Sequence, residues 1–275
     1  MWILSGFADE ISPDFEAQCR LLSDLGLRYL ELRSAWDVNV LDLDCAQLCM
    51  AKRILASHGV AVSSIGSPIG KISIEEDFAP HLERMGHAAD VARFFHAPYI
   101  RIFSFFIPEG ADADSYRDEV LRRMRELAAV AEEAGVILLH ENEKDIYGDI
   151  PRRCLDIVES VGSEHLRLAW DAANFVQVGV RPFTEGYEQL RPHLEYMQIK
   201  DAMLETGDVV PSGHGDGELI ETFRSLRRDG FDGFFSLEPH LNTTHALGGF
   251  SGPELFTQAW RAFTDILDTE HISYA

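Results

Sequence analysis

Basic residues, cysteine pairs and long hydrophobic runs are all scarce in this sequence. The chain has 24 Lys and Arg residues against 46 Asp and Glu residues, which gives a formal net charge of −22. A surface this negative repels phosphate backbones and anionic lipids, so neither a nucleic acid nor a membrane is an expected partner. A small carbohydrate and a divalent cation remain compatible with this charge, and the negative field favours recruitment of the cation.

The four cysteines form no CxxC pair, so the usual zinc-finger spacing is absent. Cys45 and Cys49 lie four residues apart on a predicted helix and are expected to be small buried side chains. No apolar run reaches the roughly 18 residues of a membrane span, and the acidic start MWILSGFADE lacks the basic region of a signal peptide. We therefore expect a cytoplasmic protein with reduced thiols.

Short apolar segments alternate with helical patterns along the whole chain. Strands are predicted at residues 2–7, 28–32, 60–65, 98–103, 136–139, 166–170, 194–199 and 233–237. Helices are predicted at residues 12–26, 43–58, 75–95, 113–133, 151–161, 183–190, 219–228 and 253–267, the first with Ser12 as its N-cap. Strict alternation predicts parallel pairing of the strands.

Eight such units in 275 residues correspond to about 34 residues each, the size of one βα unit. The predicted fold is therefore α/β, a (β/α)8 TIM barrel, with one domain over residues 1–275. A doubly wound open sheet would require a glycine-rich phosphate turn, and neither GxGxxG nor GxxxxGK[ST] occurs.

Four consecutive predicted strands end in side chains that carry oxygen donors, namely Glu141, Asp171, Gln198 and Glu238. The C-terminal ends of the strands hold the active site of such barrels. A single strand-end carboxylate is more often a helix cap or a partner of arginine. Four together favour a shared divalent cation, which offsets the cost of placing carboxylates beside apolar strands. Their hard oxygen donors suit Mn²⁺ or Mg²⁺ better than Zn²⁺.

Five segments carry a resemblance to a known family: LLHEN (138–142), LAWDAAN (168–174), QIKD (198–201), GHGDG (213–217) and LE (237–238). In order and placement they resemble the xylose isomerase-like TIM barrels, the sugar isomerase and epimerase superfamily. The resemblance implies one divalent ion bound by a Glu, an Asp, a His and a Glu at four strand ends. It also implies that the two Glu residues act as the acid/base pair. Carried over by position, the ligands are Glu141, Asp171 and Glu238, with Glu141 and Glu238 as catalytic residues.

The chain departs from the family pattern at two places. Gln198 stands where the third ligand is usually His, and it binds a cation more weakly through its oxygen. The alternatives are three carboxylates with water, or a loop residue such as His214. The ketose 3-epimerases of the family carry Glu, His and Arg where this chain has Tyr147, Asn174 and Leu204, so free-ketose epimerisation is not implied. Mn²⁺ is the expected ion, with Mg²⁺, Co²⁺ and Zn²⁺ as alternatives.

Further residues are predicted to contact the substrate, and they are Glu31, Arg101, His140, Asn174, Lys200 and His240. Lys200 is placed to polarise a substrate oxygen, and His240 shares strand parity with Glu238. His140 points away from the barrel interior by strand alternation, unless the geometry of the strand end turns it inward.

Two other groups of side chains have two interpretations each. Glu31 and Arg33 share strand parity, so they either line the pocket or pair with charged groups inside the barrel mouth. Phe103, Phe105 and Phe106 form either a pocket wall or a contact between copies of the chain in a homo-oligomer.

The leading hypothesis is a metal-dependent isomerase or epimerase of a sugar or cyclic polyol, in which Glu141 and Glu238 transfer a proton next to a metal-bound carbonyl. One alternative is a lyase that eliminates water or an aglycone from an enolised keto sugar. A second is a sugar-binding barrel without activity. The endonuclease IV branch of this fold is disfavoured, because it needs a three-zinc cluster rich in His and a DNA-binding surface.

Overall fold

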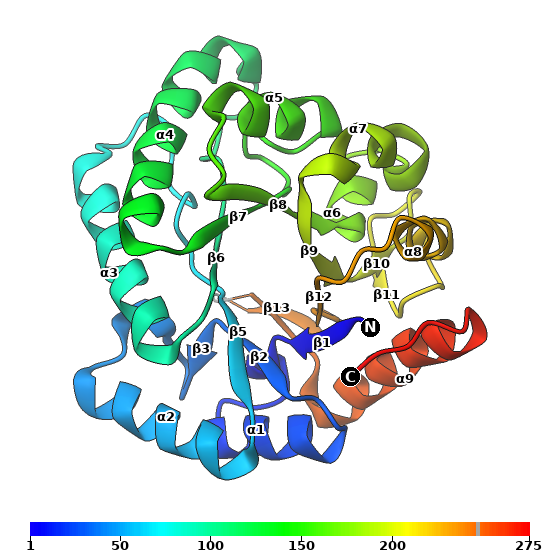
Figure 1. Ribbon diagram of the computed structural model, residues 1–275. Helices are drawn as coiled ribbons and strands as arrows, with labels where there is room; N and C mark the ends of the chain where they lie inside the picture. The colour runs from blue at the N-terminus through cyan, green and yellow to red at the C-terminus, as the bar shows by residue number, and fades with distance from the viewer. Residues whose placement is uncertain (246–247) are drawn as a thin grey trace.

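The computed structural model describes residues 1–245 and 248–275. Eight parallel strands form the central sheet, in the hydrogen-bonded order β1-β12-β9-β8-β7-β6-β5-β2. Their bounds are β1 Ile3–Gly6, β2 Tyr29–Leu32, β5 Ala61–Ile65, β6 Tyr99–Ile102, β7 Ile137–Glu141, β8 Leu166–Asp171, β9 Leu194–Ile199 and β12 Phe234–Leu237. β1 and β2 contact each other, so the sheet curves into a nearly closed barrel (Figure 1). The predicted (β/α)8 architecture is confirmed.

Helices surround the barrel on its outer side (Figure 1). They are α1 Phe15–Asp24, α2 Cys45–His58, α3 Ala79–Phe95, α4 Arg117–Ala134, α5 Pro151–Val161, α6 Ala172–Gln177, α7 Glu188–Leu190, α8 Leu219–Arg228 and α9 Gly252–Thr269. Short 3-10 segments lie at Ala8–Glu10, Val40–Asp42, Ala113–Tyr116 and Arg191–His193, and a π-helical turn lies at Pro182–Tyr187. The predicted bounds of α5 and α8 agree with the structure at both ends.

Local side-chain bonds to the backbone explain where two helices begin. The predicted N-cap of α1, Ser12, is wrong, because the carboxylate of Asp14 accepts the Glu16 N–H at 3.0 Å and the helix begins at Phe15. The predicted helix at residues 75–95 begins only at Ala79. Before that residue, polar side chains such as Asp77, which accepts the Ala79 N–H, hold a turn that competes with the helix.

Helix α2 shows which sequence signals are reliable and which are not. Asp44 and Gln47 form a capping box at its start, and Gly59 ends it with φ +65°, as predicted for a C′ glycine. The predicted burial of Cys45 and Cys49 is wrong, since both are exposed. The helix buries Ala51 and Leu55 instead, so its apolar stripe lies on a different face.

The alternation of side chains along the strands determines which residues fill the barrel interior below the candidate site. Tyr196 of β9 points into the barrel, where its hydroxyl is 2.9 Å from the Ser63 hydroxyl. Leu139, Ala169 and Tyr196 form a small cluster of their own inside the barrel. Because inward-pointing positions recur every second residue, the next inward positions on β7, β8 and β9 are Glu141, Asp171 and Gln198.

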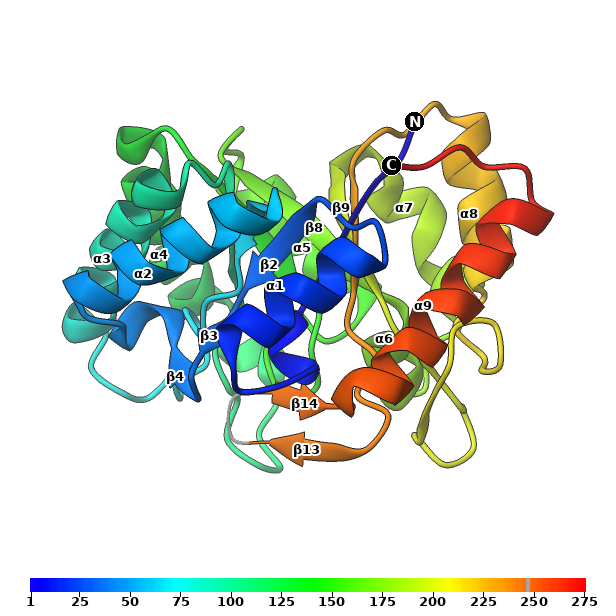
Figure 2. The same ribbon diagram turned by 90° about the horizontal axis from the view of Figure 1, so that it is seen from below.

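Three hairpins extend the loops that follow the barrel strands. They are β3–β4 (Ser34–Ala35 and Val38–Asn39), β10–β11 (Asp201–Ala202 and Val209–Val210) and β13–β14 (Thr243–His245 and Gly248–Phe250). Figure 2 shows the two chain termini near each other at one end of the barrel, with β3–β4 and β13–β14 at the opposite end. That opposite end carries the C-terminal ends of the strands. Across the described residues, no helix is long and apolar enough to cross a membrane.

Candidate active site

Three buried carboxylates converge at the C-terminal ends of the strands. Glu141 ends β7, Asp171 ends β8 and Glu238 follows β12, and each is at most 2% exposed. One carboxylate oxygen of each lies within 4.8 Å of those of the other two. We call these three residues the carboxylate triad. The sequence predicted all three at strand ends, and the structure brings them together.

Glu238 has the largest number of charged partners in the triad. Arg33 donates to its Oε1 at 2.7 Å, and Lys200 donates to its Oε2 at 3.1 Å. The His240 Nε2 lies 3.3 Å from Oε1. Burial alone would raise the pKa of Glu238, but the nearby charges of Lys200, His240 and Arg33 outweigh it and hold this pKa well below its ordinary value.

At Glu141 and Asp171, the effect of burial on the pKa outweighs the effect of the neighbouring cations. Arg101 donates to Glu141 Oε2 at 3.2 Å, yet burial dominates and raises the pKa of Glu141 to about 8. Burial also raises the pKa of Asp171 to about 6, against the charge of Lys200 at 2.8 Å. Asn174 links the two acids, since its N–H caps α6 on Asp171 Oδ1 at 2.9 Å and its side-chain amide donates to Glu141 Oε1 at 3.2 Å.

Gln198 lies on the strand between the acids but faces another partner. Its Nε2 donates to Glu31 Oε2 at 3.0 Å, so its amide is oriented by Glu31. Its Oε1 is buried and accepts no hydrogen bond from the described residues. Gln198 therefore borders the triad with one oxygen available, and its predicted role as a metal ligand remains a prediction.

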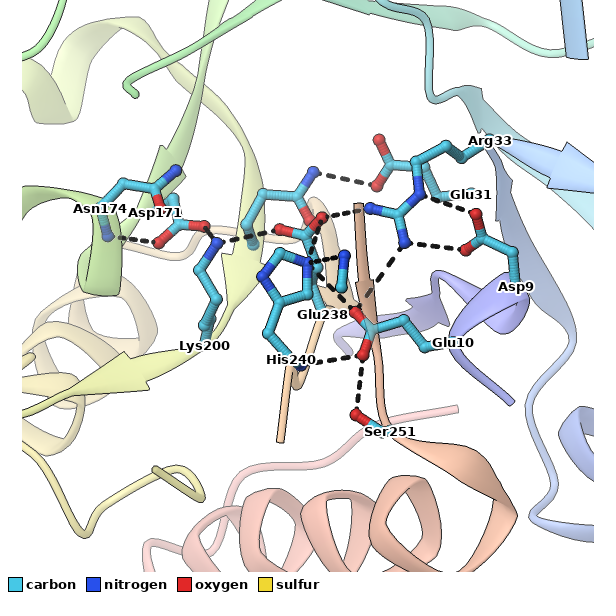
Figure 3. Close-up of polar contacts among 12 residues, drawn as sticks. Asp9, Glu10, Glu31, Arg33, Asp171, Asn174, Lys200, Glu238, His240 and Ser251 are labelled. Carbon is cyan, nitrogen blue, oxygen red and sulfur yellow. Dashed lines mark hydrogen bonds and ion pairs between the residues drawn. The ribbon is translucent and has the colours of Figure 1, made fainter. Parts of the chain in front are cut away.

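A second cluster lies beside the triad, and of its members the sequence analysis named Arg33, as a partner of charged groups, and His240 but missed Asp9, Glu10 and Ser251. Arg33 forms a two-pronged pair with Asp9 at 2.7 and 3.0 Å (Figure 3). Glu10 accepts the His240 N–H and the Ser251 hydroxyl, both at 2.8 Å, and burial raises the pKa of Glu10 to about 8. The signal was available, because GFADE (6–10) places carboxylates just after β1, much as HEN (140–142) places one at the end of β7.

Figure 3 shows how these contacts join the two clusters through Glu238. Lys200 lies between Asp171 and Glu238, and Arg33 lies between Glu238 and Asp9. Of the predicted substrate contacts, Glu31, Arg101, Asn174, Lys200 and His240 each bond to a triad residue or to its immediate neighbour Gln198.

Other predicted residues lie away from the triad, and His140 requires a correction. It lies outside the barrel, on the face of β7 that packs near Cys154, Trp170 and Gly148, because alternation turns it opposite to Glu141. It is therefore not among the residues that can contact a substrate beside the triad. His214 is exposed and lies near the α8–α9 side, so it is not close to the triad either.

The loop that carries His214 is held in place by one carboxylate. Asp201 accepts the N–H groups of Gly213, Gly215 and Gly217 at 2.9 to 3.0 Å. An added Cβ at Gly215 or Gly217 would lie 2.5 to 2.6 Å from an Asp201 oxygen, which explains the glycines of GHGDG.

Two of the three phenylalanines considered from the sequence are interior, and Phe106 is half-buried. Phe103 and Phe105 are fully buried, which excludes these two as contacts between copies of the chain. The guanidinium of Arg101 lies 4.9 Å and the Lys71 ammonium 4.2 Å from the centroid of the Phe103 ring.

The donor chemistry of the triad fits a divalent cation. The triad offers three carboxylates within 4.8 Å of one another, and Asp171 Oδ2 and Gln198 Oε1 are buried and accept no aligned hydrogen bond from the described residues. The Lys200 contact to Asp171 Oδ2 is an ion pair outside hydrogen-bond alignment. Hard oxygens of this kind are the ligands that Mg²⁺ and Mn²⁺ prefer.

Comparisons with known proteins agree with the fold. A 2-epi-5-epi-valiolone 7-phosphate 2-epimerase from Actinoplanes sp. is 30% identical over 222 residues, covering 80% of this chain and 73% of the relative. The structure of the probable 3-DHS dehydratase AsbF from Bacillus anthracis matches with a TM-score of 0.75 at 18% identity, covering 96% of this chain and 99% of that one. A xylose isomerase-like TIM barrel protein from Mycobacterium smegmatis, solved with magnesium, has a TM-score of 0.71 at 20% identity, covering 97% and 98%.

The two solved structures share the fold of this chain. The family model described as xylose isomerase-like TIM barrel matches residues 19–262, which include the whole triad. The chain therefore belongs to the xylose isomerase-like TIM barrel family.

Proposed function

We propose that this protein is an isomerase or epimerase of a sugar or cyclic polyol, acting by proton transfer at a carbon next to a carbonyl. The observation that carries the proposal is the pair Glu141 and Glu238. Both are buried at the barrel mouth on different strands, and one oxygen of each lies within 4.8 Å of the other. Two carboxylates that approach one space from different strands can remove a proton and return it at a second position.

A divalent ion is part of this proposal, with Glu141, Asp171 and Glu238 as the residues that would hold it and Gln198 beside them. When bound, such an ion supplies Lewis-acid polarisation of a carbonyl oxygen. Mn²⁺ is the ion we favour, on the donor chemistry of the triad.

The side chains around the triad supply binding and orientation. Lys200 and Arg101 are donors within reach of the triad oxygens, and both are charged groups suited to a carbonyl or hydroxyl oxygen. Asn174 fixes Glu141 through its amide and so sets the direction from which that carboxylate approaches the substrate. His240, at 3.3 Å from Glu238, lies at the rim where a sugar hydroxyl would enter.

The named relative supports the epimerase reading, since it is a 2-epimerase by name. Its substrate name includes a phosphate, and the strongly negative charge of this chain is a reason to test unphosphorylated substrates alongside phosphorylated ones.

A lyase is the second candidate, on one specific observation. Tyr147 stands where the ketose 3-epimerases of the family carry a substrate-binding Glu. Its hydroxyl donates to Asp156 at 2.7 Å instead of reaching the triad. A dehydratase would share the proton abstraction and differ only in the loss of water, and one neighbour in fold is named a probable dehydratase.

The test is deuterium incorporation from heavy water into a panel of ketoses, 3-keto sugars and cyclic polyol ketones with added Mn²⁺. We expect incorporation at carbon with at least one substrate, and its loss in the Glu141→Gln, Glu238→Gln double variant. Retained mass with altered configuration identifies an epimerase or isomerase, and loss of water or an aglycone identifies a lyase. Incorporation that survives in the double variant contradicts the proposal, and no incorporation with any substrate favours a binding protein.

A further inference from the structure

Every carboxylate oxygen of the triad already has a nitrogen partner from the chain itself. Asn174 and Arg101 contact the two oxygens of Glu141 at 3.2 Å each. The Asn174 N–H and Lys200 contact those of Asp171 at 2.9 and 2.8 Å. A divalent ion that uses these oxygens must therefore share or replace existing contacts.

The same is true of Glu238, where Arg33 contacts Oε1 at 2.7 Å and Lys200 contacts Oε2 at 3.1 Å. Among the residues that the structure describes, Lys200 is thus the one cation that bridges two triad members at hydrogen-bond distance. It is 4% exposed, and its ammonium lies between Asp171 and Glu238 (Figure 3).

We propose that the Lys200 ammonium and a divalent ion compete for the same oxygens of Asp171 and Glu238, so that Lys200 weakens metal binding and must leave this position when metal binds. The inference rests on the proposed function only in assuming that a divalent ion binds the triad. It goes beyond the proposed ligands by identifying Lys200, a residue of the chain itself, as a competitor of the ion.

Lys200 is the cation able to move, for reasons of geometry. Arg33 is fixed by its two-pronged pair with Asp9, and Arg101 lies against the rings of Phe7 and Phe103. Lys200 is a compact charge on a flexible four-carbon stem, which can change position without a change of backbone. Its contact with Asp171 Oδ2 is not an aligned hydrogen bond, so among the triad oxygens a single hydrogen bond, to Glu238 Oε2 at 3.1 Å, holds the ammonium in this position.

A displaced Lys200 ammonium needs a new acceptor among the groups beside the triad. Gln198 already directs its amide nitrogen to Glu31, so it offers the displaced ammonium only its free oxygen.

The experiment is a titration of chelator-treated protein with Mn²⁺ alone, followed by calorimetry or by the electron paramagnetic resonance of free Mn²⁺. Lys200→Met keeps the length of the side chain and removes the charge, and we expect it to bind Mn²⁺ about tenfold more tightly or better. Lys71→Met is the matched control, because Lys71 pairs with Glu143 at 3.2 Å and with no triad oxygen. We expect it to stay within about twofold of the wild type.

A Lys200→Met variant that binds Mn²⁺ no more tightly than the wild type, or not at all, overturns the inference. Because removal of Lys200 leaves two buried carboxylates less compensated, thermal unfolding with and without Mn²⁺ is measured in parallel. We expect Mn²⁺ to raise the unfolding temperature of Lys200→Met more than that of the wild type, and an equal or smaller rise contradicts the competition. Neither measurement uses a substrate, so failure here leaves the proton-exchange test of the proposed function intact.

Discussion

At the residue scale, the barrel mouth places carboxylates and cations in direct contact while excluding water. Glu141, Asp171 and Glu238 face Arg33, Arg101 and Lys200, and all six side chains are nearly inaccessible to solvent. Removing one member of such a buried pair is expensive, because its partner keeps an uncompensated charge. The arrangement is therefore a constraint on any substitution at the site.

Gln198 provides the sharpest test of the donor set at this scale. Replacing it with His should raise the affinity for Zn²⁺ relative to that for Mn²⁺ by about tenfold, because imidazole suits Zn²⁺ whereas an amide oxygen suits Mn²⁺. Gln198→Met, which removes the oxygen at similar volume, should bind no better than the wild type. Titration of chelator-treated proteins checks this, and equal affinities in the His and Met variants would show that this side chain does not reach the ion.

The triad and several residues around it could be predicted from sequence, whereas the pairing among those residues could not. Strand ends identify Glu141, Asp171 and Glu238, because a carboxylate directly after an apolar strand is a local signal. The partner of Gln198 is Glu31, which is 167 residues away in the chain, so no local pattern contains that contact. Glu10 was missed although a carboxylate just after β1 is a local signal, and its contacts with Ser251 and His240 come from the other end of the chain.

At the element scale, the loop after β9 depends on one buried carboxylate. Asp201 accepts the N–H groups of Gly213, Gly215 and Gly217, and α8 begins two residues later at Leu219. These hydrogen bonds hold the glycine-rich segment in place.

Asp201→Ala should lower the free energy of unfolding by at least about 2 kcal/mol, because bonds from N–H groups to a charged acceptor are lost together. Amide hydrogen exchange at Gly215 and Gly217 should also accelerate. The matched control is Asp208→Ala, an exposed acid in the neighbouring turn, which should change neither quantity. Unchanged exchange in Asp201→Ala would contradict the role given to this carboxylate.

Helix α3 supplies a pH-sensitive contact to the loop after β5. The Gly70 N–H donates to Nε2 of His81 at 2.7 Å, which requires a neutral ring. Burial, helped by the charges of Arg84 and Arg123, lowers the pKa of His81 from its ordinary 6.5 to about 4. Below pH 6.5 the unfolded chain therefore takes up a proton that the folded protein does not.

The stability contributed by this neutral His81 should be present above pH 6.5 and should fall as the pH drops towards 4, by up to roughly 3 kcal/mol. Chemical unfolding of the wild type and of His81→Gln across this range isolates the contribution. The difference between the two proteins should shrink as the pH falls, and a difference that is constant from pH 7 to pH 4 would contradict the assignment.

The boundaries of helices show a similar division between local and distant causes. The capping box of α2 and the bounds of α5 and α8 follow from local sequence. Helix α6 was not predicted, because its cap is Asp171, whose carboxylate is also a member of the triad. The carboxylate of Asp171 suggests a metal ligand and its position suggests the end of a strand. Neither feature indicates that Asp171 also caps a helix.

At the scale of the whole molecule, composition determines which large partners are compatible. The net charge of −22 opposes binding of a phosphate backbone. We predict no specific affinity for duplexes with an abasic site at physiological salt, although a DNA-repair branch shares this barrel. A mobility-shift assay at micromolar protein checks the prediction, and a salt-dependent shift would contradict it.

The topology of the barrel could be predicted because strands and helices alternate regularly along the sequence. Eight alternations of apolar strand and helix give a parallel order, and closure follows from the number of units. The small hairpins β3–β4 and β13–β14 were not predicted, because strands of two or three residues carry no periodic signal.

The most direct test determines which of the two acids removes the proton from which epimer of a substrate pair. Glu141 and Glu238 approach the substrate from different strands, so each should remove the proton from one epimer of a substrate pair. In heavy water, Glu141→Gln should lose exchange with one epimer and retain it with the other, and Glu238→Gln should show the reverse preference. Turnover between epimers should fall by about 10² to 10⁴-fold in both variants. Glu195→Gln is the control, because it makes the same change near the N-terminal end of β9, at the end of the barrel away from the triad. It should behave as the wild type. Equal loss of exchange with both epimers in both variants, or full exchange in either, would contradict the assignment of Glu141 and Glu238 as the acid/base pair.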